Sequence, residues 1–507
     1  MPPEHLPSAG LDSRPFPRSA PLACAAALGT LLAAACAVGP DFKKPAAPDA
    51  DAYATNPVAT TASTAGIAGG DAQHFVPGGD IPADWWTLFH SAPLSELIEH
   101  SLTKNPDLEA AQAALSVAHE GVLAQRGAYY PSISGDFSAT RQRQAGTLSP
   151  TPASNVLLYN LFTPEVNVAY VPDVFGLNRR TVESLQAQAD AARFQMIATY
   201  NTLTANVVVT AIQQGSVQQQ IDATHQLIDF NTKAVQILRY QFSKGYASGL
   251  DVAAQESQLA QVAATLPPLV KQAAQLRDLM ADLAGEFPGQ APPGGFELAS
   301  LTLPQDLPVS LPADLVTQRP DVRQAEADLH AASARIGIAV ANRLPNVTLS
   351  ATTGSTALAI NQLLTTGTGF WSVGADLTAP IFQGGALLHQ ERGARAAYRE
   401  AAAQYRSTVL AACQNVADTL AALAQDAEGL KAAAAAADAA KVTLDLAERQ
   451  WRDGYAGYLA LLSAEQAWQQ ARINLVQAQA SRYADTAALF QALGGGWWHR
   501  QELAGNP

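Results

Sequence analysis

The stretch "QWRDGYAGYLALLSAEQAWQQ" (Gln450–Gln470) decides the fold of this chain. It interrupts a long Ala- and Gln-rich sequence with two glycines, after which the helical composition resumes at once. Much earlier, "RYQFSKGYASGLDVAAQESQ" (Arg239–Gln258) repeats the same arrangement. Glycine ends helices and permits tight turns. We therefore expect two helical hairpins whose tips are the turns Gly245–Gly249 and Gly454–Gly457.

The segments that lead into these turns are unusually long. No proline stands between Leu177 and Ser243, nor between Gly385 and Arg452. At about 1.5 Å per residue, each segment would form a helical rod of about 100 Å, whereas an average globular helix has about a dozen residues. The apolar stripe is thin and Ala and Gln prevail. This composition favours helices packed side by side in a wall over helices around a globular core.

Four segments have the composition of β-strands: Pro131–Thr140, Pro164–Val171, Pro345–Thr352 and Gly369–Phe382. In the last segment, apolar residues from Trp371 to Leu377 alternate with polar ones, a period of two. A soluble sandwich gives this pattern, and so does a membrane barrel with lipid outside and water inside. The alternation alone leaves both alternatives open.

The two halves of the chain correspond to each other. Pro131 matches Pro345, and Gly245 with its following tyrosine matches Gly454 with its own, at nearly the same interval. The chain is therefore expected to be a tandem duplication of strand, strand, long helix, turn and long helix. One chain supplies too few strands to close a β-barrel and too few helices to close a ring of helices, so we expect an oligomer.

The overall composition excludes several classes of protein. The chain has 507 residues, of which 48% are hydrophobic and 15% charged, with a net charge of −13. It is too apolar for a disordered protein, and its acidity argues against a nucleic-acid partner. No HExxH or GxSxG motif is present and the histidines are scattered. We expect no catalytic residue, no metal site and no enzymatic activity.

The N-terminal segment has the features of an export signal. Arg14 and Arg18 precede an apolar run that ends at Cys36 and is too short to span a bilayer. Small residues precede Cys36 as in a lipobox, although Leu32 stands one place early. We predict that Cys36 becomes the acylated first residue of the mature protein, the lipid being the only cofactor. The alternative is an ordinary signal peptide. Ala37, in place of Asp, suggests outer-membrane sorting.

The remaining segments complete the expected organisation. The Pro-, Gly- and Thr-rich sequence after Cys36 predicts an extended tether, with ordered structure beginning at Asp84. A break between two helices is expected at Asn105, before a proline. Asp321 is expected to stabilise a helix start, and Cys413 to be a buried apolar residue.

The expected boundaries are a signal peptide (1–35), a lipid-anchored tether (36–84), a first repeat (85–289), an inter-repeat linker (290–320), a second repeat (321–494) and a C-terminal tail (495–507).

Several stretches resemble the signature sequences of lipidated outer-membrane efflux proteins, the TolC/OprM-like outer membrane factors of the NodT type. The resemblance runs from Cys36 to about Gly494 and includes the following stretches in order: "CAVGPDFKKP", "DWWTLFHSAPLSELIEHSLTKNPDL", "RPDVRQAEADLHAASARIGIAVANRLPNVTLSAT" and "LTAPIFQGG".

The resemblance implies a mainly helical homotrimer. Each subunit would give four strands to a twelve-stranded outer-membrane β-barrel and its long hairpins to a periplasmic α-barrel. The protein would be a passive exit duct, docked by a periplasmic adaptor to an inner-membrane pump of the resistance-nodulation-division kind. Two alternatives remain: a type I protein-secretion duct, and a periplasmic coiled-coil adaptor or structural protein. The strand alternation argues against the adaptor.

The resemblance also implies roles for the hairpin tips. Leu459 takes the place of an apolar constriction at the periplasmic gate, and the position one helical turn later, commonly acidic in the family, is Ser463. This difference puts an acidic gate ring in doubt, although Asp453 could partly replace it. The other tip residues are expected to dock the adaptor: Gly245, Tyr246, Ser248, Asp251, Gly454, Tyr455 and Gly457.

Overall fold

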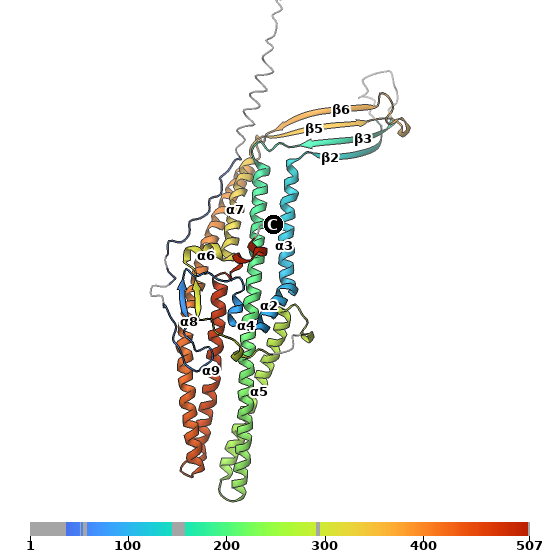
Figure 1. Ribbon diagram of the computed structural model, residues 1–507. Coiled ribbons are helices and arrows are strands. Elements are labelled where there is room, and N and C mark those ends of the chain that lie inside the picture. Colours follow the sequence, from blue (N-terminus) through green and yellow to red (C-terminus); the bar gives the residue numbers. More distant parts are fainter. Residues whose placement is uncertain (1–36, 51, 54–57, 144–157, 291–294, 505–507) are drawn as a thin grey trace, which may run out of the picture. The chain divides into compact units, whose positions relative to one another are not determined.

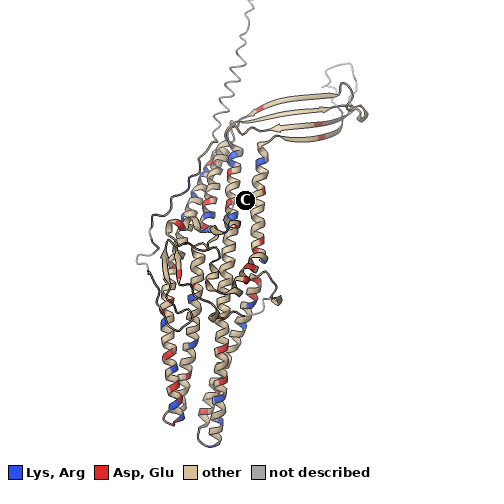
Figure 2. Ribbon diagram, in the orientation of Figure 1, with Lys and Arg blue, Asp and Glu red and all other residues tan. Residues whose placement is uncertain are grey.

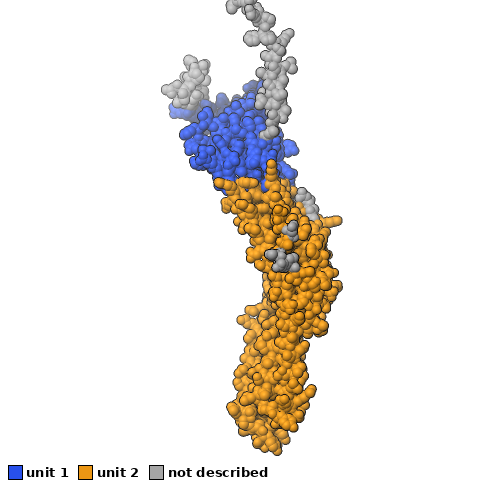
Figure 3. Space-filling model, turned by 90° about the vertical axis from the view of Figure 1, so that its left-hand side faces the viewer, with its two compact units in different colours: residues 1–42, 122–184, 332–397 blue, residues 43–121, 185–331, 398–507 orange. Residues whose placement is uncertain are grey.

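The computed structural model describes residues 37–50, 52–53, 58–143, 158–290 and 295–504. The chain divides into two compact units (Figure 3). Unit 1 comprises Met1–Phe42, Val122–Ser184 and Ala332–Ala397, and unit 2 comprises Lys43–Gly121, Leu185–Ala331 and Tyr398–Pro507.

The two expected hairpins are present (Figure 1). Helix α4 (Leu177–Ser243) and helix α8 (Ala386–Arg452) have 67 residues each. Their returning partners, α5 (Gly249–Leu283) and α9 (Tyr458–Ala492), have 35 residues each. The equal lengths confirm the duplicated helix–turn–helix, and the predicted ends of the long helices are correct to within one residue.

Four antiparallel strands form one sheet in unit 1, in the order β2-β3-β5-β6. The strands are β2 (Ser132–Arg143), β3 (Leu158–Tyr170), β5 (Asn346–Ser355) and β6 (Gly369–Thr378). Each half of the duplication thus contributes one hairpin to the sheet. In the described part of the chain, β2 and β6 each have a single neighbour in the sheet and form its open edges.

All four strands differ from their expected boundaries: β2 and β5 each continue three residues beyond the expected ends, Thr140 and Thr352, and β3 and β6 differ as follows. Strand β3 continues N-terminally past Pro164 to Leu158, whereas the sequence suggested a start at the proline. A proline is tolerated there because pairing on that side of β3 is interrupted between the bridge Phe162–Ala357 and the ladder with β5 that begins at Glu165, so Pro164 needs no N–H on that side. Strand β6 ends at Thr378, before Pro380, and does not reach Phe382.

Ordered structure begins well before Asp84, so that expectation was wrong. Strand β1 (His74–Pro77) pairs in parallel with β4 (Asp306–Val309). The preceding Gln73 is fully buried and donates from Nε2 to the carbonyl of Pro304 (2.9 Å) and to Thr486 Oγ1 (3.0 Å). The segment is ordered through contacts with distant parts of the chain, which composition does not reveal.

The remaining elements of the chain are short by comparison. They are η1 (Trp85–Phe89), α2 (Ala92–Lys104), α3 (Pro106–Arg126), η2 (Gly127–Tyr129), η4 (Pro288–Gln290), η5 (Leu298–Ser300), α6 (Pro312–Gln318), α7 (Pro320–Ala341), η6 (Ile360–Gln362), η7 (Trp497–His499) and α10 (Gln501–Ala504). Stacked aromatic rings stabilise unit 2, where Trp85 and Phe490 have centroids 5.2 Å apart. No helix in the described ranges is both long and apolar enough to cross a membrane.

The structure tests the expectations for Asn105, Asp321 and Cys413. Asn105 separates α2 from α3 as expected, and its side-chain oxygen accepts from the backbone of Asp107 (3.0 Å). Asp321 lies in the first turn of α7, where it accepts from Arg319 (2.7 and 2.9 Å). Cys413 is half-buried on α8, so the expectation of a buried side chain was wrong.

Candidate functional site

The sheet of unit 1 has one apolar face, which we call the apolar face of the sheet. The strand register places Ile133, Val168, Ala351 and Val373 side by side across all four strands. Trp371 and Val373 are 77% and 75% exposed, although both are large and hydrophobic. Charged residues are sparse in the strands compared with the helices (Figure 2). This face is suited to contact with an apolar medium.

The opposite face, the polar face of the sheet, carries a hydrogen-bonded network. Asp136 lies directly across from Glu165 in the β2–β3 register. The side chain of Asn167 donates to Asp136 Oδ2 (3.0 Å) and to Glu165 Oε1 (3.1 Å), and it accepts from Thr352 Oγ1 (2.7 Å). The network therefore crosses three strands and is suited to contact with water.

A sheet with one apolar and one polar face can form the wall of a pore. In lipid, a sheet must leave no unpaired edge, because unsatisfied backbone groups are costly there. Strands β2 and β6 are open edges in the described single chain. In lipid, both of these edges would have to be paired with other strands.

Both hairpin tips have the same backbone geometry. Gly245 and Gly454 have φ angles of +77° and +79°, a left-handed conformation that only glycine adopts easily. The amide of the next residue bonds to the carbonyl five positions earlier: Tyr246 to Gln241 (2.9 Å) and Tyr455 to Gln450 (2.8 Å). These are Schellman motifs, and they explain why each long helix ends at its glycine.

The first tip is closed by a capping box at the start of α5. Ser248 Oγ accepts from the amide of Asp251 (3.2 Å), and Asp251 Oδ2 accepts from the amide and hydroxyl of Ser248 (3.0 and 2.7 Å). These hydrogen bonds lower the pKa of Asp251. Both residues thus have a structural role in the hairpin. Beside them, Tyr246 is 85% exposed.

The second tip presents a different surface. Gly457 is the N-cap of α9 and supplies no side-chain cap. Leu459 is 62% exposed, and Ser463, one turn later, is also exposed, so the two lie on one side of α9. Asp453 and Tyr455 are exposed next to Gly454. The sequence-predicted gate residues are therefore brought together on the solvent side of the second tip.

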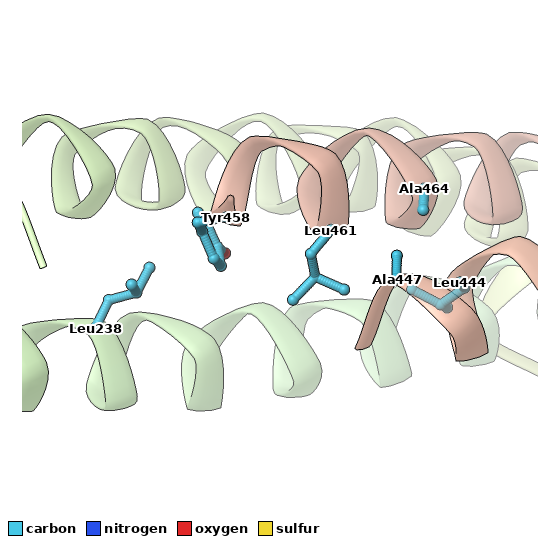
Figure 4. Packing of buried hydrophobic residues seen from close by; sticks show 6 residues of the cluster. All are labelled: Leu238, Leu444, Ala447, Tyr458, Leu461 and Ala464. Atoms are coloured by element: carbon cyan, nitrogen blue, oxygen red, sulfur yellow. The ribbon is translucent and has the colours of Figure 1, made fainter. Parts of the chain in front are cut away.

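The other side of α9 packs against the first hairpin (Figure 4). We call this cluster the tip core, and its buried members are Leu238, Leu444, Ala447, Tyr458, Leu461 and Ala464. Leu238 belongs to α4, whereas the others belong to α8 and α9. The tip core therefore joins the two halves of the duplication near their turns.

Next to the tip core lies a buried polar group of four residues that sequence reasoning missed. We call it the interhairpin cluster: Asn231 of α4, Gln255 of α5, and Tyr458 and Glu465 of α9. Tyr458 donates to Gln255, Gln255 Nε2 donates to Asn231 Oδ1 (2.7 Å), and Asn231 Nδ2 donates to Glu465 Oε1 (2.7 Å). The hydrogen bonds link three helices from the two hairpins.

The sequence did contain a signal for this cluster. Asn231 stands at helical spacing between Leu227 and Val235, and all three side chains are buried. A polar residue in an apolar stripe requires a hydrogen-bonding partner. The stripe predicts that a partner exists, but it does not identify Glu465, which is 234 positions away.

Cys36 itself lies outside the described residues, but the residues that follow it have defined contacts in unit 1. The amide of Val38 donates to the carbonyl of Phe175 (3.1 Å). The buried Arg180 donates from Nε to the carbonyl of Val38 (3.1 Å) and from Nη2 to Asp41 (2.8 Å). Position 37 is therefore held close to the start of α4.

The described residues offer no group of three or more His, Cys, Asp or Glu side chains that could hold a metal ion. The candidate functional features are the two faces of the sheet in unit 1 and the two hairpin tips in unit 2.

Comparison with known proteins gives the family. Residues 97–286 and 311–495 match the family described as outer membrane efflux protein. The probable efflux pump outer membrane protein SepC of Pseudomonas putida is 30% identical over 444 residues, covering 82% of this chain and 86% of SepC. The outer-membrane channel OprN, 27% identical, superposes with a TM-score of 0.81 over 91% of this chain and 100% of OprN. The outer membrane protein VceC from Vibrio cholerae, 26% identical, superposes with a TM-score of 0.76 over 82% of this chain and 99% of VceC. The chain therefore belongs to the outer membrane efflux protein family, and it is an outer-membrane exit duct.

Proposed function

We propose that three copies of this chain form a passive duct through the outer membrane, through which small molecules leave after an inner-membrane pump has supplied the energy. The observation that carries this proposal is the four-stranded sheet with one apolar face, one polar face and two open edges. Pairing β2 of one copy with β6 of the next closes the sheet. The apolar face then contacts lipid and the polar face lines the pore.

A tripartite assembly accounts for the hairpin tips. Tyr246 and Tyr455 are 85% and 87% exposed at the two turns, in equivalent positions of the duplication. Exposed aromatic side chains are frequent anchors of protein interfaces. We propose that both tips dock a periplasmic adaptor, which links the duct to a pump of the resistance-nodulation-division kind. The relative SepC is itself described as part of an efflux pump.

The second tip is the proposed periplasmic gate. Leu459 is exposed on α9 and is free to meet its counterparts in a trimer. Ser463, on the same side of the helix, gives a polar uncharged ring in place of a carboxylate ring. Asp453 at the C-cap of α8 supplies the only carboxylate in the turn itself, Asp453–Gly457.

A lipid on Cys36 fits the contacts of the residues next to it. Ala37 lies against Gly176, just before α4, and six positions after β3 ends at Tyr170. The attachment point is thereby held near one end of the strands that we place in the membrane. We propose that the acyl chains enter the inner leaflet of the outer membrane beside the sheet.

Membrane fractionation tests the duct against the periplasmic adaptor alternative. The protein should sediment with outer-membrane vesicles after washing with high salt and carbonate. It should also migrate faster on gels when unheated than when heated, because a closed barrel resists detergent. Recovery in the soluble periplasmic fraction without a heat-dependent shift would favour the adaptor and contradict the duct.

A further inference from the structure

Glu465 is a buried carboxyl group at the contact between the two hairpins. It is 1% exposed and lies one helical turn beyond Leu461 of the tip core. Its Oε1 accepts from Asn231 Nδ2 (2.7 Å), whereas its Oε2 has no hydrogen-bond partner among the described residues. Burial of a carboxylate with one unsatisfied oxygen is costly, and the cost falls when the group is neutral.

The groups around Glu465 do not compensate a negative charge. Helices α4 and α5 present the neutral side chains of Asn231 and Gln255. Helix α8 presents Glu448, a like charge that disfavours ionisation, and α9 itself presents Tyr458. No lysine, arginine or histidine of the described chain lies within ion-pair distance of Glu465.

Two cations of the second hairpin, Lys441 and Arg472, are engaged with other groups. Lys441 pairs with Asp445 and lies 5.4 Å from the Trp468 ring. Arg472 lies over the same ring (5.0 Å) and donates to Gln226 (3.1 Å). Together, burial and Glu448 raise the pKa of Glu465 to about 7, against the hydrogen bond from Asn231, which lowers it.

The position of Glu465 connects its charge to the gate. Tyr458 and Glu465 both belong to α9 and are bound through Gln255 and Asn231 to the first hairpin. Leu459 follows Tyr458 directly and lies on the exposed side of the same helix. A displacement of α9 away from α4 and α5 therefore moves Leu459 as well.

We propose that Glu465 controls the contact between the hairpins through its protonation state: the neutral carboxyl holds α9 against α4 and α5, and the carboxylate weakens this contact and favours an open periplasmic end. This inference rests on the proposed trimeric duct and adds a regulatory residue to it. In the released state Glu465 meets water, and its pKa returns towards the usual value of about 4.3.

The direction of the pH effect follows from these two states. A carboxyl whose pKa is higher in the closed state stabilises that state fully at low pH, and the effect is lost as the pH rises towards 7. Between the two pKa values, the closed-to-open ratio falls by up to about tenfold per pH unit in each subunit, and above 7 it levels off. The duct should therefore open more readily at pH 8 than at pH 5.

The experiment compares channels of the purified full-length protein in planar bilayers at pH 5, 6, 7 and 8. The open probability of the wild-type channel should rise at least tenfold over this range. Glu465→Gln, which keeps the acceptor for Asn231 but carries no charge, should hold the channel at the wild-type pH 5 level at every pH. Glu428→Gln, which neutralises an exposed carboxylate beside Lys431, should leave the wild-type pH dependence intact.

A second variant separates the loss of charge from a general loosening of the hairpins. Gln466 Nε2 donates to Gln258 Oε1 (2.6 Å), an uncharged bond between α9 and α5 next to the cluster. Gln466→Ala should raise the open probability at every pH without changing its pH dependence. Infrared titration adds a direct readout. The carboxyl band that titrates near pH 7 in the wild type should lose intensity in Glu465→Gln, and the remaining intensity belongs to Asp485, whose pKa burial and Asp426 also raise to about 7.

Results that would overturn the role of Glu465 differ from those that would overturn the duct. Open channels whose probability does not depend on pH, or a Glu465→Gln channel with unchanged pH dependence, would overturn the role of Glu465 alone. An infrared titration identical in wild type and Glu465→Gln would overturn it as well. Absence of any pore at every pH would overturn the duct, and the role of Glu465 with it.

Discussion

Leu459 is the residue on which the proposed gate depends most. Its side chain is 62% exposed near the start of α9, where three copies would meet. Leu459→Gly should widen the narrowest point, since three isobutyl groups are removed, and raise single-channel conductance several-fold. Sensitivity of cells to vancomycin should rise in parallel. Leu459→Ile keeps the side-chain volume and should behave as wild type. Unchanged conductance in Leu459→Gly would remove this residue from the gate.

A second prediction at the residue scale concerns the anchor. Cys36→Ser should abolish labelling of the protein by a palmitate analogue, because serine offers no thiol for the diacylglycerol. Cys413→Ser, which alters the half-buried cysteine on α8, is the matched control and should be labelled like the wild type. Continued labelling of Cys36→Ser would show that the lipid is attached elsewhere.

Sequence reasoning at this scale identified side chains better than it identified their partners. The glycines at 245 and 454 could be assigned to turns because their left-handed conformation is a property of the single residue. Asn231 and Glu465 could not be paired, since their contact depends on how α4 and α9 pack. Ser248 and Asp251 were assigned to docking, and the structure shows in addition that they cap α5.

At the scale of elements, the two faces of the sheet lead to a matched pair of substitutions. Val373 and Ser372 are neighbours in β6, paired with Ala351 and Thr352, and point to opposite faces. Val373→Arg places a charge on the proposed lipid side and should destabilise the assembled barrel by about 2–4 kcal/mol. Ser372→Arg places the same charge on the pore side and should be tolerated.

The heat-dependent shift on gels measures this difference. We expect the unheated, faster-migrating form to be lost in Val373→Arg at a temperature at which the wild type and Ser372→Arg retain it. Equal loss in both variants would mean that the two faces do not differ in their surroundings, which would contradict the assignment of lipid and pore sides.

Helices could be predicted more fully than strands, for a physical reason. Helical hydrogen bonds are local, so a proline-free run between two glycines, Gly176 and Gly245, was sufficient to bound α4. Strand bonds are made with distant residues, and so the extension of β3 beyond Pro164 depended on where β5 stops pairing. The contacts of Gln73 and the pairing of β1 with β4 are equally non-local.

At the scale of the whole molecule, a single chain is an incomplete structure. The sheet has two open edges in the described chain, and the proposed gate residues Leu459 and Ser463 lie on an exposed side of α9. A sheet in lipid needs its edges paired, and we propose that further copies of the chain pair with them. The family match supports a channel, and we propose that three subunits form it.

Native mass spectrometry of the full-length protein, extracted from the outer membrane in mild detergent, tests that claim most directly. We expect one dominant species with three times the mass of the denatured subunit, retained in the Glu465→Gln variant. A dominant monomer or dimer in the same detergent, from preparations that still form pores in bilayers, would contradict the three-subunit duct.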